Sequence, residues 1–234
     1  MAHHLFSSGD SHPLTTETTK TKEKHMSLIV SEQTDDTPRT LVPEGPSIAR
    51  CYSLIDLGTH DDEWQGKVRK RRKVVVGFEF PEHTAVFKEE DGEQPLGRSQ
   101  VFTANLGAKA NLRKTLESWR GKAFDAKELE GFDLQGILGA PALVTVTHVE
   151  KDGKKKDRIQ SIGAVPKGLE CPEAVNEPFA YDIAEHPKNF DRLPNWAKEE
   201  VLSSDEYLAL AHPDGVPSAD GADPLTEETD NTPF

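Results

Sequence analysis

The sequence predicts a mainly β domain with one principal helix, preceded and followed by segments that have no fold of their own. Three observations lead to this prediction. Short runs rich in valine, isoleucine and phenylalanine recur between residues 47 and 165. One stretch between them has helical rather than strand periodicity. Both ends of the chain are rich in polar and charged residues and have too little apolar sequence to form a core.

Three strands are expected before the helix, and each is an apolar run that ends near a glycine or a proline. They cover residues 47–57, 73–80 and 100–106. In the second run, Phe78 and Phe80 share one strand face with two valines. We therefore expect both rings to lie in the core.

The helix is expected directly after these strands. Three apolar residues repeat at helical spacing and define its buried face: Leu112, Leu116 and Trp119. Gly121 is placed to end this helix. Asp125 and Glu128 then have the spacing of a capping box, which indicates the start of a second, short helical turn.

Two more strands, residues 142–150 and 158–165, flank a turn at residues 151–154 and are expected to form a hairpin. The complete order is three strands, a helix and two strands. This is the order of the OB-fold, a five-stranded, partly open Greek-key barrel whose helix lies between strands three and four. A generic α+β sandwich is the alternative.

After the barrel, two short amphipathic helices are expected at residues 194–202 and 203–211. In the second, Ser203 and Glu206 have the spacing of a capping box. The predicted organisation has four parts: a disordered N-terminal arm (1–40), an OB-fold domain (41–168), a partly helical extension (169–211) and a disordered acidic tail (212–234).

The net charge of −13 is confined to the C-terminal third of the chain. Residues 168–234 have 16 acidic and three basic side chains, whereas residues 1–167 are neutral overall. A neutral body with local basic runs can bind phosphates even though the whole chain is acidic. The overall charge therefore does not exclude a nucleic-acid ligand.

Other classes of protein find little support in the sequence. No apolar run has the length of a membrane helix or the form of a signal peptide, so we expect a cytoplasmic protein with no membrane partner.

Cys51 and Cys171 are isolated and suit reduced thiols better than a metal site. Motifs for nucleotide binding, hydrolysis and metal-dependent proteolysis are missing, so we expect neither an enzyme nor a cofactor. The acids Asp56, Asp61, Asp62 and Glu63 leave a magnesium-dependent nuclease as a further alternative.

Two basic clusters point to a polyanionic ligand. The first has six Lys or Arg residues in the seven positions 67–73, and the second lies at 154–158. In an OB-fold the first cluster falls on the loop between strands one and two and on the entry to strand two. The second falls on the loop between strands four and five, and the two loops flank the same groove. We therefore expect the two clusters to border one cleft. Two solvated surface loops are the alternative.

Single-strand binding also requires aromatic faces on which bases stack. Tyr52 on the first strand, Trp64 beside the first basic cluster and Phe102 on the third strand are candidates, with core packing as the alternative for each. The residues expected to contact nucleic acid are Arg50, Tyr52, Trp64, Lys67, Arg69, Lys70, Arg71, Arg72, Lys73, Phe102, Lys154, Lys155, Lys156 and Arg158.

The chain ends in an acidic run followed by a proline and a phenylalanine. This ending resembles the C-terminal tails with which bacterial and phage single-stranded DNA-binding proteins dock partner proteins, although Asn231 and Thr232 depart from the bacterial pattern. An apolar pocket and a basic side chain suffice to bind such an end. The predicted docking residues are Glu227, Glu228, Asp230, Pro233 and Phe234.

The helical region also resembles a phage-encoded protein family that includes OB-type single-stranded DNA-binding proteins. The resemblance covers residues 111–139 and extends more weakly from roughly residue 46 to residue 176. The matching segments are Asn111-Leu112-Arg113-Lys114, Glu117-Ser118-Trp119-Arg120-Gly121-Lys122, Gly131-Phe132-Asp133-Leu134 and Leu138-Gly139.

This resemblance and the residue pattern together predict a phage single-stranded DNA-binding protein of the bacterial host cytoplasm, with little sequence specificity and a role in DNA replication or recombination. Its expected partners are single-stranded DNA and, through the acidic tail, replication or recombination proteins. The sequence leaves open whether the protein forms a homo-oligomer. The alternative is an OB-fold adaptor that binds a host replication or repair factor and no DNA.

Overall fold

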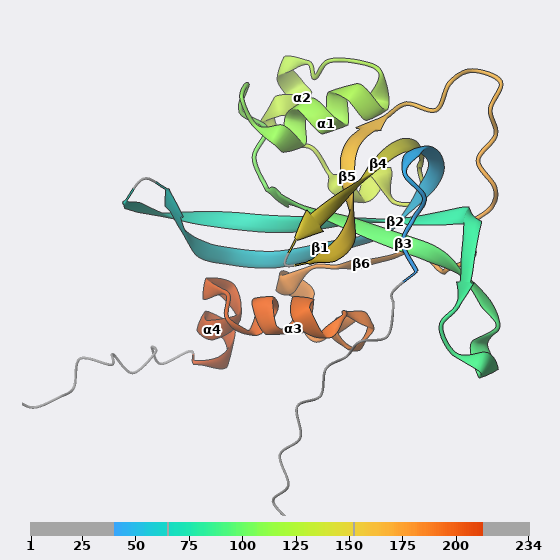
Figure 1. Ribbon diagram of the computed structural model, residues 1–234. Helices are drawn as coiled ribbons and strands as arrows, with labels where there is room; N and C mark the ends of the chain where they lie inside the picture. Colours follow the sequence, from blue (N-terminus) through green and yellow to red (C-terminus); the bar gives the residue numbers. More distant parts are fainter. Residues whose placement is uncertain (1–39, 65, 152, 213–234) are drawn as a thin grey trace, which may run out of the picture. The chain divides into compact units, whose positions relative to one another are not determined.

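The computed structural model describes residues 40–64, 66–151 and 153–212 (Figure 1). The predicted N-terminal arm, apart from residue 40, and the predicted acidic tail, apart from residue 212, lie outside these residues. The docking residues expected at the end of the tail therefore also lie outside the described part of the chain.

The described residues form a mainly β structure, as predicted. Five long strands lie in the sheet order β3–β2–β1–β4–β5, and their pairings are all antiparallel. A short sixth strand pairs with β1 in parallel. The strands are β1 (Gly45–Trp64), β2 (Lys67–Val86), β3 (Glu93–Thr103), β4 (Pro141–Lys151), β5 (Lys154–Gly163) and β6 (Phe179–Tyr181).

The sheet is open, so the predicted barrel is not closed by backbone hydrogen bonds. β3 and β5 are its edge strands, and within the described ranges no strand pairing joins them. A largely buried ion pair between Arg98 of β3 and Asp157 of β5 links the two edges. Asp157 also accepts a hydrogen bond from the backbone N–H of Val42 at 2.9 Å. The two edges of the sheet are therefore joined through side chains.

β1 and β2 are much longer than predicted, since each has 20 residues. Most of residues 58–72, predicted as a loop, form the outer half of a β hairpin that projects to the left in Figure 1. The prediction failed because these residues are charged and lack an apolar alternation. Opposite charges across the strands support the hairpin instead: Asp61, for example, lies opposite Lys70.

Two helices lie between β3 and β4, as predicted: α1 (Asn111–Arg120) and α2 (Ala126–Glu130). The three apolar residues predicted for α1 are all buried. Gly121 ends α1 in a left-handed conformation with a φ of 67°. Both hydrogen bonds of the predicted capping box between Asp125 and Glu128 are present. Two short 3₁₀ helices are η1 (Glu89–Asp91), between β2 and β3, and η2 (Leu134–Ile137), after α2.

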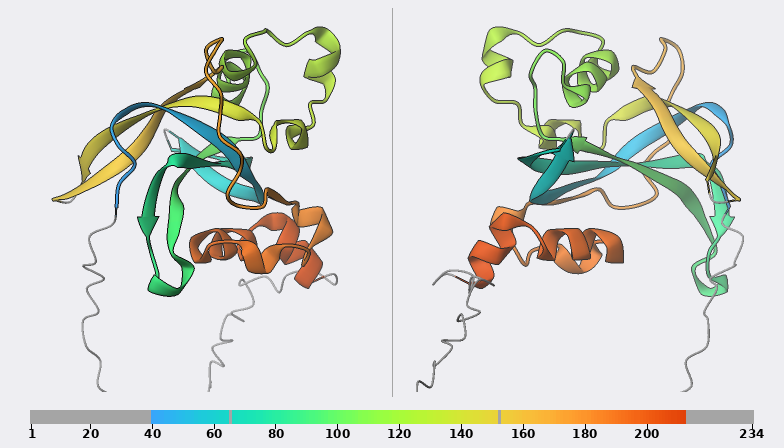
Figure 2. Two further views of the ribbon diagram at one scale, coloured as in Figure 1. Left: turned by 90° about the vertical axis from the view of Figure 1, so that its right-hand side faces the viewer. Right: turned by 60° about the vertical axis from the view of Figure 1, so that its left-hand side comes forward.

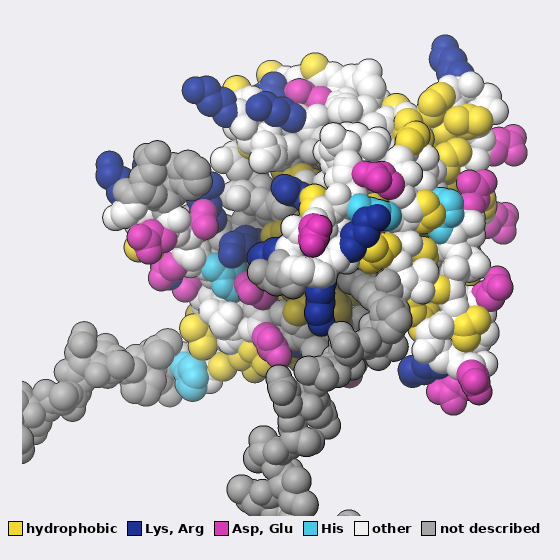
Figure 3. Space-filling view, viewed as in Figure 1, with side chains coloured by type: hydrophobic (Ala, Val, Ile, Leu, Met, Phe, Trp, Pro, Cys, Tyr) yellow, Lys and Arg dark blue, Asp and Glu magenta, His cyan; other side chains and the backbone are white. Residues whose placement is uncertain are grey.

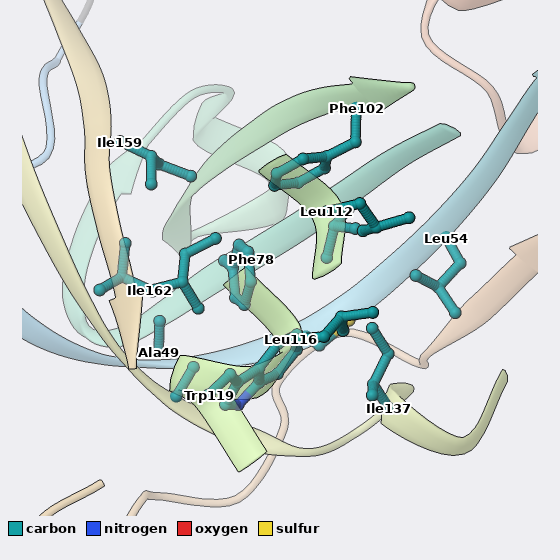
Figure 4. Packing of buried hydrophobic residues seen from close by; sticks show 14 of the residues in the cluster. Ala49, Leu54, Phe78, Phe102, Leu112, Leu116, Trp119, Ile137, Ile159 and Ile162 are labelled. Carbon is teal, nitrogen blue, oxygen red and sulfur yellow. The ribbon is translucent and has the colours of Figure 1, made fainter. Parts of the chain in front are cut away.

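The main core lies between one face of the sheet and α1 (Figure 4). Phe78 and Phe80 are completely buried, as predicted, and the ring centroid of Phe78 lies 5.3 Å from that of Trp119. The indole N–H of Trp119 donates to the carbonyl of Pro141 at 2.7 Å, so its polar group is satisfied inside the core. Burial of each Phe side chain stabilises the fold by about 1.5–3 kcal/mol.

The C-terminal extension partly covers the opposite face of the sheet. It consists of β6, η3 (Ile183–Glu185), η4 (Phe190–Arg192), α3 (Asn195–Leu202) and α4 (Asp205–Ala211). A second apolar cluster joins it to β1 and β2: Ile55, Leu57, Val75, Phe179, Tyr181, Ile183, Leu193, Ala197 and Val201. Both predicted helices are present, but Ser204 rather than Ser203 caps α4, accepting from the Tyr207 N–H at 3.3 Å. The prediction was wrong by one residue because Ser203 ends α3, where its N–H bonds to helix carbonyls.

Two opposed side chains hold the segment between β5 and β6 in place. Arg50 and Glu79 are direct partners in the β1–β2 register. Arg50 donates to the backbone carbonyls of residues 171–172 at 2.6–3.2 Å. Glu79, which is 1% exposed, accepts from the backbone N–H groups of residues 175–176, both at 3.0 Å. This clamp fixes the point at which the extension enters the outer face of the sheet.

Candidate nucleic-acid interface

The first basic cluster lies on β2 itself, in the projecting hairpin, rather than on a loop as predicted. We call residues 59–64 and 66–73 the basic hairpin. Three of its cations are held in ion pairs: Lys70 with Asp61 and Asp205, Arg71 with Asp62, and Arg72 with Asp56. The Asp56 carboxylate raises the pKa of Arg72 by accepting its hydrogen bonds. Positive and negative side chains are therefore mixed on this hairpin, at the left of Figure 3.

The other three cations of this cluster, Lys67, Arg69 and Lys73, have no ion pair with any described residue. Because side chains alternate along a strand, these three share one hairpin face with Arg71 and lie opposite to Lys70. A polyanion that approaches this face meets three cations that are not already neutralised.

The second basic cluster lies at the start of β5, where Lys154, Lys155, Lys156 and Arg158 are all exposed. The tip of the β4–β5 hairpin points in a different direction from the tip of the basic hairpin (Figure 1 and Figure 2). Neither of the two grooves described next is lined by residues 154–158. The expected common cleft is not found in these grooves, because the long β1–β2 hairpin carries the first cluster away from the second.

Small residues lie on the outer face of β2 and β3, in the part that the extension does not cover. Gly77 and Ser99 are partners in the β2–β3 register, and Gly97 lies two residues before Ser99. The ring of Tyr52 lies against both glycines. A Cβ at Gly77 would lie 2.0 Å from the hydroxyl of Ser53 and 3.4 Å from Tyr52 Cε1, and a Cβ at Gly97 would lie 3.7 Å from the Tyr52 hydroxyl. Glycine at position 77 is thus required for this packing.

A groove of about 400 Å³ follows this face. The sheet contributes Tyr52 to its lining, and the extension contributes Phe179, Arg192 and Trp196. Trp196 is 42% exposed, and the Arg192 guanidinium lies 4.4 Å from the ring centroid of Phe179. Burial raises the pKa of the Tyr52 hydroxyl above its ordinary value. The groove thus combines aromatic rings with a cation.

A second groove, of about 300 Å³, lies further along β3 beside the basic hairpin. Arg71 lines it from the hairpin, Val101 and Thr103 from β3, and Lys109 from the segment before α1. Val101 is 48% exposed. The two grooves therefore lie along one strand, and each is lined by cationic and apolar side chains.

The structure separates the predicted aromatic candidates. Tyr52 lines the first groove, as its proposed role requires. Phe102 is 4% exposed and belongs to the core, so its predicted stacking role is wrong. It lies opposite Val74, which also faces the core, whereas Val101 next to it points outward. Trp64 is the last residue of β1, and its side chain lies outside the described part of the structure.

The sequence pattern gave Arg50 an incorrect role and did not indicate Trp196 as a site residue. Arg50 was expected to contact nucleic acid, but its guanidinium is occupied by backbone carbonyls, including that of Gly139 at 2.8 Å. Trp196 lies in the segment 194–202, which was expected only to form an amphipathic helix. Because α3 buries Ala197 and Val201, position 196 lies outside the buried stripe, and a tryptophan there indicates an exposed aromatic surface.

Two of the acids considered for a magnesium site form ion pairs within the basic hairpin. Asp61 and Asp62 are in ion pairs with Lys70 and Arg71. Over the described ranges, no group of three or more His, Cys, Asp or Glu side chains is arranged to hold a metal ion. The hairpin acids therefore support the strand pairing.

Comparisons with known proteins add no family to these observations. No family model matches the chain, and no curated protein matches its sequence. Of the helices in the described part of the chain, none has the length and apolar character needed to cross a membrane.

Proposed function

We propose that this protein binds single-stranded DNA with little sequence preference along the outer face of β2 and β3, in the host cytoplasm during phage DNA replication or recombination. The proposal includes an OB-fold architecture for the body. In its support, the sheet order β3–β2–β1–β4–β5, with a helix between β3 and β4, agrees with that fold. OB-folds bind oligonucleotides on the face of strands two and three.

One observation supports the proposal most strongly: two grooves that follow β3 are lined by aromatic rings and by cations. Tyr52 and Trp196 line the first groove, and Arg71 and Lys109 line the second. The cations of the basic hairpin continue this path beyond the sheet.

These residue types suit a ligand whose sequence varies. A base stacked on an aromatic ring contributes about 1–3 kcal/mol whatever its identity, because every base has a π-face. Contacts between cations and phosphates add a salt-dependent term that is equally independent of sequence.

The acidic tail has a place in the same proposal. It follows α4, whose Asp205 already pairs with Lys70 of the basic hairpin at 2.9 Å. We expect the tail to compete with DNA for the hairpin cations and to become available to replication or recombination proteins when DNA binds. Deletion of residues 221–234 should then leave the affinity for single-stranded DNA equal or higher and abolish partner binding. A large loss of DNA affinity would contradict this role of the tail.

The second candidate is an adaptor that binds a host replication or repair factor and no DNA. The ion pairs of the basic hairpin favour it, since three of the six cations of the first cluster are already neutralised. Such neutralisation weakens the attraction of phosphates.

Titration of a fluorescently labelled oligothymidine, followed by anisotropy at several salt concentrations, distinguishes the two. DNA binding predicts tight association that weakens steeply with salt. Trp196→Ala should reduce the affinity by about five- to 150-fold if one base stacks on this ring. Leu202→Ala is the matched control, because Leu202 is a 40% exposed apolar residue of the same helix that does not line the groove. Absence of binding at low salt would refute the proposal and favour the adaptor.

A further inference from the structure

β2 and β3 extend beyond the sheet as a second projection, at the end opposite the basic hairpin (Figure 1). We call residues 82–94 the acidic arm. The β2–β3 register shifts between Phe80 and Thr84, where the two strands turn away from the sheet. Beyond this point Thr84 lies opposite Pro95 and Val86 opposite Glu93. The arm is thus a two-stranded hairpin whose tip is η1.

The arm has a strongly acidic composition and exposed apolar side chains at its tip. Its charged side chains are Glu82, Lys88, Glu89, Glu90, Asp91 and Glu93, and its acids form no ion pair with any described residue. Val86 and Phe87 are 57% and 58% exposed. Adjacent exposed apolar residues within a charged rim are typical of a protein-binding surface.

The basic hairpin carries cations that can neutralise these acids. Lys67 and Arg69, near its tip, share one strand face and have no ion pair with any described residue. Val68, which is 62% exposed, points to the opposite face, where its cross-strand partner is Glu63. The arm and the Lys67–Arg69 face are therefore complementary in charge.

We propose that the acidic arm of one copy of this protein docks on the outer basic hairpin of a second copy. The two surfaces lie at opposite ends of β2, so they are different patches and the contact is head-to-tail. Each added copy leaves one arm and one hairpin unoccupied. Assembly is then open-ended, and its extent rises with protein concentration and falls with salt.

This contact goes beyond the proposed function, because it needs no DNA. A row of copies joined through β2 would also present their β2–β3 faces in succession. Because the docked arm would occupy Lys67 and Arg69, which the proposed function assigns to DNA, docking and DNA binding should compete for these two cations.

Sedimentation velocity of the full chain tests the contact. We expect a weight-average mass that increases with concentration at low salt and returns to the monomer at high salt. Two neutralised variants separate the surfaces: the arm variant Glu89→Gln/Glu90→Gln/Asp91→Asn and the hairpin variant Lys67→Gln/Arg69→Gln. Each alone should weaken self-association by at least about tenfold. All five side chains are exposed, so circular dichroism should show unchanged folding.

The decisive sample is an equimolar mixture of the two variants. The hairpin variant keeps an intact arm and the arm variant keeps an intact hairpin, so the mixture should form a one-to-one complex that does not grow further. A wild-type chain that stays monomeric at low salt, an arm variant that associates like the wild type, or a mixture without a complex would each overturn the proposal. Binding of the arm variant to an oligothymidine long enough for one copy should be unchanged, which separates this result from the test of DNA binding.

Discussion

Arg69 and Lys73 have no ion pair with any described residue, and the double substitution Arg69→Gln/Lys73→Gln should weaken single-stranded DNA binding by an amount that depends on the salt concentration. For single strands, each phosphate contact contributes about 0.7 to the slope of log affinity against log salt. The loss of two contacts therefore reduces this slope by about 1.4. If the wild type and the variant bind equally at about 1 M salt, this slope change corresponds to about 25-fold weaker binding at about 0.1 M salt and about fourfold weaker binding at about 0.4 M.

The assay is anisotropy of a labelled oligothymidine over this salt range, with a charge-matched control. Lys114→Gln with Lys127→Gln removes two exposed cations of α1 and α2 that form no ion pair with any described residue. We expect this control to keep nearly the wild-type slope. Equal slope changes in both double variants would mean that only total charge matters, and the assignment of DNA to the β2–β3 face would be wrong.

Three further predictions concern the structure that supports this face. Glu79→Ala should lower the free energy of unfolding in urea by about 2–4 kcal/mol, because it removes charge-assisted hydrogen bonds to the segment after β5. Glu79→Gln should destabilise the protein less. Equal stability of the alanine variant and the wild type would contradict the clamp. Hydrogen bonds, of which the one from the Asp125 N–H is the most important, hold the pKa of Glu128 at about 2 instead of 4.5, so the stabilising contribution of Glu128 is present above pH 4.5 and is lost as the pH falls towards 2. The free energy of unfolding of Glu128→Gln, measured in urea, should therefore approach that of the wild type over this pH range. A constant difference between the two would refute the pairing. Burial raises the pKa of Cys51 to about 12, so a thiol reagent should modify Cys171 in the folded protein and Cys51 only after unfolding. Fast modification of both thiols in the native state would contradict the burial of Cys51.

The strands and helices of the body could be predicted because the spacing of their apolar residues follows from which side chains are buried. A run of apolar residues identified the inner half of β2, and the three-residue apolar stripe identified α1. The outer half of the β1–β2 hairpin could not be found in this way. Its strands are held by ion pairs between residues that are distant in sequence, such as Arg72 and Asp56, and a strand of charged residues has the composition of a loop.

The candidate site was predicted only in part. Charge and aromatic content identified the hairpin cations and Tyr52, but composition does not indicate which side of a strand a residue occupies. Phe102 and Val101 are neighbours, and the sheet register alone places the first in the core and the second at the surface. Trp196 is more than 140 positions after Tyr52, and the folded extension places both residues on one groove.

The sequence by itself determined a mainly β body, its order of strands and helices, and the concentration of negative charge at the C-terminal end, because these follow from local periodicity and composition. Only the tertiary structure decided that the sheet stays open, that the extension covers part of its outer face, and that half of the first basic cluster is neutralised by ion pairs. The physical reason is that burial and ion pairing depend on which distant residues meet, and a linear pattern does not specify those contacts.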